Sequence, residues 1–105
     1  MNNYTKLERD GKIAVLYSPG FGGGWWTWNP GYFGLLFDSE VVEAVLKKDY
    51  KLACEIAERK YPNVYTGGGD QLEVAWVPKG TQFTLTEYDG SETIHVYGDE
   101  DYHTA

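Results

Sequence analysis

The sequence predicts an α+β fold, in which one bent helix or a pair of helices covers one face of a mainly antiparallel sheet of about four strands. Three observations predict this fold: an apolar run near the N-terminus, apolar residues at helical spacing in the middle, and alternation between turn signals in the last third. A length of 105 residues suits a single domain that spans residues 1–105.

Residues 12–17 (KIAVLY) are predicted to form the first long strand. Apolar side chains occupy both alternating faces of this strand, which predicts a central place in the sheet. The dipeptide Asp10-Gly11 is a hairpin-turn signal. It is expected to fold residues 4–8, within the N-terminal segment 1–11, back as an additional edge strand.

Either one bent helix or two helices, 39–48 and 50–61, are predicted next. Asp38 is a good N-cap residue, Asp49 could cap a second helix, and Pro62 ends the helical region. Apolar residues at intervals of three and four predict one buried stripe: Val42, Leu46, Tyr50, Ala53, Ala57 and Tyr61. Cys54 lies beside this stripe and is expected to be a small packed residue.

The last third predicts a meander of three strands, joined by turns at 78–80 and at Asp89-Gly90. The two turns predict four cross-strand pairs: Trp76 with Phe83, Val74 with Leu85, Leu85 with Ile94, and Phe83 with Val96. Both turns send the same residues to one face: Leu72, Val74, Trp76, Phe83, Leu85, Ile94 and Val96. The acidic tail, 98–105, is expected to be loose.

Charge and cysteine content exclude several classes of function. With 16 acids and 9 bases the net charge is −7, which disfavours polymeric nucleic acid and anionic membranes as partners. The single cysteine excludes an intramolecular disulfide. Because the chain has no apolar run of about 18 residues and no signal-peptide core, we expect a cytoplasmic protein.

Residues 18–37 form an unusual loop that is rich in glycine and aromatic residues. Its glycines would let a ligand approach backbone amides closely, as in phosphate-binding loops. The formal motifs fail, because Trp25 stands where a third glycine is needed and the loop contains no lysine. Two interpretations of the three neighbouring tryptophans stay open: they plug the end of the fold, or they stack a planar ligand or anchor a protein.

A second glycine cluster stands in residues 65–71 (YTGGGDQ). If strands 12–17 and 72–77 are antiparallel neighbours, both clusters share one rim; otherwise 65–71 is a flexible connector. The candidate ligand-binding residues are Phe21, Gly22, Gly23, Gly24, Trp25, Trp26, Trp28, Tyr65, Thr66, Gly67, Gly68, Gly69, Asp70 and Gln71.

Catalytic and metal-binding patterns are poor. His95 and His103 are the only histidines, and with one cysteine they make no tetrahedral metal set. Ser18 lacks a nucleophile-elbow motif and a paired base. Glu87 and Glu92 are expected to face each other beside an exposed turn, where solvent mutes their interaction. We therefore expect a protein that is not an enzyme and has no cofactor or metal.

The segments IAVLYSPGFG (13–22), Gly24-Trp25, TWN (27–29) and YTGG (65–68) resemble a group of small phage and prophage proteins of unassigned function. The resemblance runs from about Lys12 to Gly98. Small phage proteins of this size are often host-defence antagonists, including oligomeric sponges that sequester nucleotide signals. The resemblance therefore implies a phage protein that acts in the host cytoplasm.

Three hypotheses for function remain, of which the third is that the loop has a structural or homo-oligomerisation role. In the first, the protein is a non-enzymatic, homo-oligomeric binder of a small nucleotide-like ligand, whose phosphate the glycine amides would hold and whose base a tryptophan would stack. In the second, it is an inhibitor or adaptor that binds a host protein through the aromatic loop.

Overall fold

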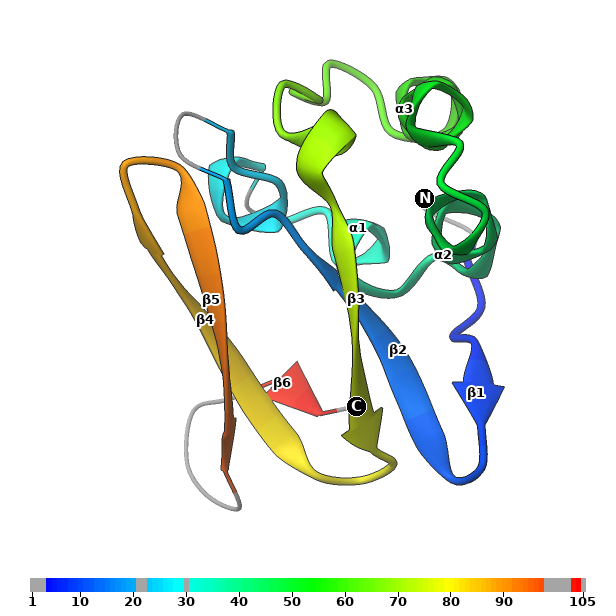
Figure 1. Ribbon diagram of the computed structural model, residues 1–105, viewed down its shortest axis with the longest axis vertical. Helices are drawn as coiled ribbons and strands as arrows, with labels where there is room; N and C mark the ends of the chain where they lie inside the picture. The colour runs from blue at the N-terminus through cyan, green and yellow to red at the C-terminus, as the bar shows by residue number, and fades with distance from the viewer. Residues whose placement is uncertain (1–3, 21–22, 30, 98–102, 105) are drawn as a thin grey trace.

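The computed structural model describes residues 4–20, 23–29, 31–97 and 103–104. It confirms the α+β class, with a helix pair and antiparallel strands (Figure 1). In chain order the elements are β1 (Glu8–Arg9), β2 (Lys12–Tyr17), the 3-10 turn η1 (Trp26–Trp28), α1 (Gly34–Phe37), α2 (Ser39–Leu46), α3 (Tyr50–Lys60), the 3-10 turn η2 (Gly69–Gln71), β3 (Glu73–Pro78), β4 (Gln82–Tyr88), β5 (Ser91–Tyr97) and β6 (His103–Thr104).

The first sheet has the order β1-β2-β3, so the predicted central strand is central. Asp10 and Gly11 both have positive φ, 53° and 76°, as a two-residue hairpin turn requires. This turn folds the N-terminal segment back onto β2 as predicted, with a strand at 8–9. On its other edge β2 pairs antiparallel with β3, and Ala14 lies opposite Trp76.

The second sheet has the order β5-β4-β6. The β4–β5 hairpin confirms the predicted turn and register, because Leu85 lies opposite Ile94 and Phe83 opposite Val96. The acidic tail is not wholly loose: within it, β6 pairs with β4. Residues 98–102 and 105 of this tail lie outside the described residues.

The predicted three-strand meander is wrong at β3, which pairs with β2 instead of β4. The predicted pairs Trp76–Phe83 and Val74–Leu85 therefore do not form. A turn does occur at 78–80, closed by the Thr81 N–H bond to the Pro78 carbonyl at 3.0 Å, but it carries the chain into the second sheet. The physical reason is that both faces of β2 are apolar, so this strand needs a layer on each side.

The first sheet accordingly lies between the helix pair and the β4–β5 hairpin, with a core on each face (Figure 1). The core on the helix side includes Ala14, Leu16, Val42, Ala53, Ala57 and Leu72. The core between the sheets includes Ile13, Val15, Leu36, Phe37, Val77, Phe83 and Leu85. The prediction of one shared apolar face is therefore wrong for Leu72, Val74 and Trp76, which pack on the helix side.

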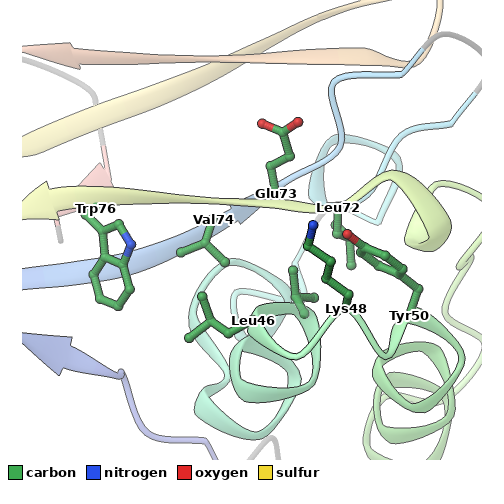
Figure 2. Close-up of a pocket in the computed structure, with 8 residues that line it drawn as sticks. Leu46, Lys48, Tyr50, Leu72, Glu73, Val74 and Trp76 are labelled. Atoms are coloured by element: carbon green, nitrogen blue, oxygen red, sulfur yellow. The ribbon is translucent and has the colours of Figure 1, made fainter.

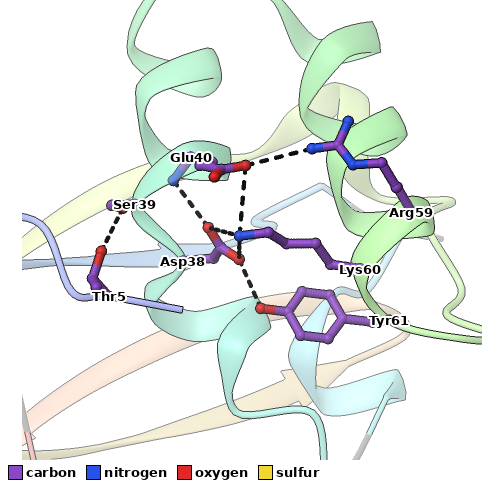
Figure 3. A network of polar contacts seen from close by, with 7 residues as sticks. All are labelled: Thr5, Asp38, Ser39, Glu40, Arg59, Lys60 and Tyr61. Atoms are coloured by element: carbon purple, nitrogen blue, oxygen red, sulfur yellow. Dashed lines mark hydrogen bonds and ion pairs between the residues drawn. The ribbon is translucent and has the colours of Figure 1, made fainter. Parts of the chain in front are cut away.

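Two helices, α2 and α3, form where the sequence predicts them, and Asp38 and Asp49 cap them as expected. Asp38 is fully buried and also accepts hydrogen bonds from Lys60 Nζ at 3.0 Å and from the Tyr61 hydroxyl at 2.7 Å (Figure 3). The start of α2 is thereby tied to the end of α3. Leu46 departs from the predicted buried stripe, because 38% of it is exposed.

The segment 18–37 is more ordered than the predicted irregular loop, since it contains η1 and α1. All four residues of α1 are buried, and Leu35 and Leu36 enter opposite cores. Tertiary packing thus stabilises a single helical turn that local propensity alone would not support.

Among the helices that the structure describes, none has the length and apolar character that a membrane span needs.

The Tyr61 hydroxyl makes stability sensitive to alkaline pH. Burial, together with the hydrogen bond to Asp38 and its charge, raises the pKa of Tyr61. Because an unfolded tyrosine ionises near pH 10, the folded state holds this proton more tightly than the unfolded state. The free energy of unfolding is therefore expected to fall as the pH rises above about 10.

Urea unfolding at about pH 9 and about pH 11 measures this fall. In the Tyr61→Phe variant, which lacks the titrating proton, we expect a smaller fall over the same interval. Equal falls in the two proteins would contradict the assignment.

Candidate functional site

The two glycine clusters meet at one rim, because β2 and β3 are antiparallel neighbours. The end of β2 and the residues that precede β3 lie side by side, and Ser18 Oγ donates to the Gly68 carbonyl at 3.0 Å. A Cβ atom added at Gly23 would lie 3.0 Å from the Gly68 Cα atom. The condition under which the sequence predicts a shared rim is therefore met.

Close packing of backbone against backbone explains several of these glycines. A side chain at Gly68 would collide with the Gly24 carbonyl oxygen, and one at Gly69 would collide with Cys54 Sγ. Gly24 has a φ of 91°, which favours glycine, and the Trp28 indole lies directly over it. At these positions the clusters contact each other and neighbouring side chains.

A buried carboxylate, that of Glu92, binds the backbone amides of the loop. Only 1% of Glu92 is exposed. Four donors bind it: Ser18 N at 2.8 Å, Trp25 N at 2.9 Å, Thr27 N at 2.9 Å and Thr27 Oγ1 at 2.7 Å. Converging backbone N–H groups of this kind form an anion-binding nest. The loop therefore contains an anion site, and the protein's own side chain fills it.

The burial of Glu92 corrects the expectation that this residue flanks an exposed turn in solvent. Glu87 and Glu92 do lie opposite each other on the hairpin, but only Glu87 is exposed. The strand register could have indicated this burial. Glu92 lies two residues before Ile94 and therefore on the same face, which the sequence predicts to be apolar. Its donors come from residues 18–27, far away in sequence, which explains why sequence reasoning missed the site.

The three neighbouring tryptophans occupy three different environments. Trp25 is fully buried, and its Nε1 donates to the Leu35 carbonyl at 2.8 Å. Trp26 is half-buried and packs against both cores. Trp28 is 41% exposed, and its ring lies 5.4 Å from the ring of Tyr65, which is 42% exposed. We call Trp28 and Tyr65 the aromatic rim.

Buried Asn29 holds the aromatic rim in place. Its Nδ2 donates to the Trp25 carbonyl at 2.6 Å and to the Tyr65 carbonyl at 2.9 Å. Its Oδ1 accepts from the Tyr65 N–H at 2.8 Å. The Asn29 side chain thus joins the segment that carries Trp28 to Tyr65, which is 36 residues from Asn29, and sequence reasoning gave it no role.

Exposed acids surround the aromatic rim. Glu87 Oε2 accepts from Trp28 Nε1 at 3.3 Å, and Glu58 Oε2 accepts from Thr66 Oγ1 at 2.6 Å. Asp70 is exposed and follows directly after the second glycine cluster. The surroundings of the rim therefore carry negative charge, which attracts basic groups and repels phosphate.

The remaining candidate residues are not all at the rim surface. Gln71 is exposed, and its side-chain amide lies against Gly20. Gly67 is exposed beneath the Tyr65 ring, and Thr66 is half-buried. Phe21 and Gly22 lie outside the described residues.

Cys54 is half-buried against the second glycine cluster, with Sγ 3.8 Å from the Thr66 carbonyl. Burial, followed by the charge of Glu58, raises the pKa of the Cys54 thiol, which disfavours the reactive thiolate. Within residues 4–20, 23–29, 31–97 and 103–104, no group of three or more His, Cys, Asp or Glu residues is placed to hold a metal ion.

Comparison of the chain with models of protein families, with curated proteins and with solved structures finds no match. What the site does is therefore inferred from its own contacts.

Proposed function

We propose that the protein is a non-enzymatic inhibitor or adaptor that binds a partner protein through the aromatic rim. The observation that carries this proposal is the division of the tryptophans. Trp25 is fully buried and Trp26 half-buried, whereas Trp28 presents its ring at the surface beside Tyr65. Tryptophan and tyrosine are the residues most enriched at the energetic centres of protein interfaces.

The charges around the rim indicate a basic partner surface. Glu87 contacts Trp28 and Glu58 contacts Thr66 beside the rim, and both acids are exposed, in a chain with a net charge of −7. Complementary charge of this kind accelerates association more than it strengthens the final complex. The resemblance to small phage proteins adds the expectation that the partner is a host protein.

A nucleotide-like ligand is less well supported, because the Glu92 carboxylate, on the amides of Trp25 and Thr27, places a buried negative charge next to the glycines whose amides would hold the phosphate. A phosphate could bind there only if the Glu92 carboxylate left the nest. Two buried carboxylates also have structural roles in place of catalytic ones: Glu92 binds the loop, and Asp38 joins α2 to α3. This supports a binding function without catalysis.

Substitution of Trp28 by alanine is expected to weaken partner binding by about 30-fold or more, as for a hot-spot residue. Tyr65→Ala should have a smaller effect in the same direction. The matched control is Leu52→Ala, since Leu52 is 40% exposed but lies on α3, away from the rim. The measurement is quantitative recovery of the partner from host cells, followed by titration of the purified pair.

Two outcomes would contradict the proposal. One is recovery of the partner by Trp28→Ala in the same amount as by the native protein. The other is saturable quenching of tryptophan fluorescence by a member of a nucleotide panel, lost in Trp28→Ala, which would assign the rim to a small ligand instead.

A further inference from the structure

A second surface lies on the helix side of β3, which is an edge strand of the first sheet. Val74 and Trp76 point from β3 to the side on which α2 lies, whereas Glu73 points to the opposite side (Figure 2). The space between β3 and the α2–α3 junction is an open depression of about 380 Å³. A second depression of about 320 Å³ continues beyond Trp76 toward the β1–β2 turn. We call these two depressions the β3 groove.

The β3 groove contains apolar side chains that are incompletely covered. Leu46 is 38% exposed, and Tyr50, Val74 and Trp76 are each half-buried. Leu46 and Tyr50 belong to the stripe that the sequence predicts to be buried. The fold thus leaves apolar side chains open next to an edge strand, and such edges favour pairing with another strand.

The walls of the β3 groove carry positive charge, although the chain as a whole is acidic. Lys48 lines one end, and Arg9 and Lys12 line the other. Arg9 lies over the Trp76 ring at 5.5 Å, and in the described part of the chain no carboxylate lies within ion-pair distance of Lys48 or Lys12. Two acids also line the groove in the described part of the chain, Asp10 and Glu73. The Glu73 carboxylate points to the other side of β3, where it accepts from the Tyr17 hydroxyl at 3.2 Å (Figure 2).

We propose that the β3 groove binds an extended, acidic peptide segment of a partner protein, which adds a strand to the open edge of β3. An apolar side chain of the segment would fill the depression between Val74 and Leu46. Carboxylates on either side of it would meet Lys48 at one end and Arg9 and Lys12 at the other. Main-chain pairing gives affinity in this mode of binding, and alternate side chains give specificity.

The charges favour this occupant over a second copy of the chain. Antiparallel pairing of two β3 strands about a two-fold axis would bring Lys48 of one copy toward Arg9 and Lys12 of the other, which places like charges together. This inference does not rest on the aromatic rim, which shares no residue with the β3 groove. If both surfaces act, the protein is an adaptor that holds a basic and an acidic partner.

The test uses the full chain and a seven-residue peptide, Glu-Thr-Phe-Thr-Val-Thr-Glu, with both of its termini blocked. Its alternate side chains, two Glu, Phe and Val, are the ones that would face the groove. Binding is measured by changes in amide and indole NMR signals, which are expected at Val74, Leu46 and the Trp76 indole. The double variant Lys12→Glu/Lys48→Glu is expected to bind about tenfold more weakly. The matched control is Lys51→Glu, an exposed charge reversal on α3 outside the groove, which should leave binding within about twofold.

A backbone N-methylated version of the peptide, which cannot pair with a strand edge, should lose binding altogether. The proposal is overturned if the peptide in which lysine replaces both glutamates binds equally well. It is also overturned if the signals move at Trp28 and Tyr65 instead of Trp76, or if sedimentation shows a dimer that excludes the peptide. Loss of groove binding would leave the aromatic rim unaffected, so the two proposals fail separately.

Discussion

Replacing Glu92 with alanine is expected to lower the free energy of unfolding by about 3–5 kcal/mol. The carboxylate accepts from three backbone amides and one hydroxyl, and its side chain is 1% exposed. Removal leaves the buried amides of Ser18 and Trp25 and the partly buried donors of Thr27 without this acceptor, and each buried donor left unpaired costs about 1–3 kcal/mol. Because the free energy of unfolding of native domains is only about 5–15 kcal/mol, the expected loss is a large fraction of the total stability. Urea unfolding followed by circular dichroism measures the change.

Two further variants separate the carboxylate's role from general effects of substitution. Glu87→Ala removes the residue directly opposite on the same hairpin, but Glu87 is exposed, so the expected loss is about 1 kcal/mol or less. Glu92→Gln keeps the size and one acceptor oxygen, and we expect an intermediate loss because its NH2 group faces donors. If Glu92→Ala were as stable as the native protein, the loop amides would have other acceptors and the assignment would be wrong.

The same nest provides a chemical check on Glu92. Acetate added to Glu92→Ala can occupy the emptied space and accept from the amides of Ser18, Trp25 and Thr27. Because a ligand that binds only the folded state stabilises it, acetate should raise the unfolding midpoint of this variant more than chloride at equal ionic strength. The native protein should show no such difference.

Features set by a few neighbouring residues could be predicted from the sequence. The Asp-Gly turns at 10–11 and 89–90 adopt positive φ because their own residues permit it. Asp38 and Asp49 cap α2 and α3 because a side-chain oxygen reaches an amide two or three residues ahead. Such local chemistry does not depend on the rest of the fold.

The partner of β3 could not be read from local chemistry, because the turn at 78–80 is compatible with a hairpin and with a crossing into another sheet. Two apolar faces on β2 were the available signal, since they require a layer on each side. That requirement places β4 and β5 across the sheet from the helices. Val77, and not Trp76, then faces Phe83 in the core between the sheets.

The meeting of the two glycine clusters could be predicted from the sequence, but the group that binds the loop amides could not. The glycine clusters meet as the strand pairing implied, yet the anion in the nest is Glu92, which is 74 residues from Ser18. Nothing in the tryptophan cluster itself distinguishes Trp25, which fills the core, from Trp28, which lies at the surface. That distinction depends on the direction of the chain through η1, which long-range packing decides.

Replacing Asp38 with alanine is expected to lower the free energy of unfolding by about 3 kcal/mol or more. Asp38 is fully buried and accepts from Glu40 N at 2.9 Å, Lys60 Nζ at 3.0 Å and the Tyr61 hydroxyl at 2.7 Å. Its loss uncaps α2 and leaves a buried hydroxyl and a largely buried ammonium group without their acceptor. Urea unfolding near pH 7 gives the difference from the native protein.

Asp49→Ala is the matched control for Asp38→Ala, because Asp49 caps α3 in the same way but is exposed. Loss of an exposed cap costs about 1 kcal/mol, so the excess loss in Asp38→Ala measures the buried network. In the double variant Asp38→Ala/Tyr61→Phe, the free energy of unfolding should fall by less than the sum of the two single-variant losses, because both substitutions remove the same hydrogen bond. Strict additivity would mean that Asp38 acts as a cap alone and that α2 and α3 are joined by their apolar contacts.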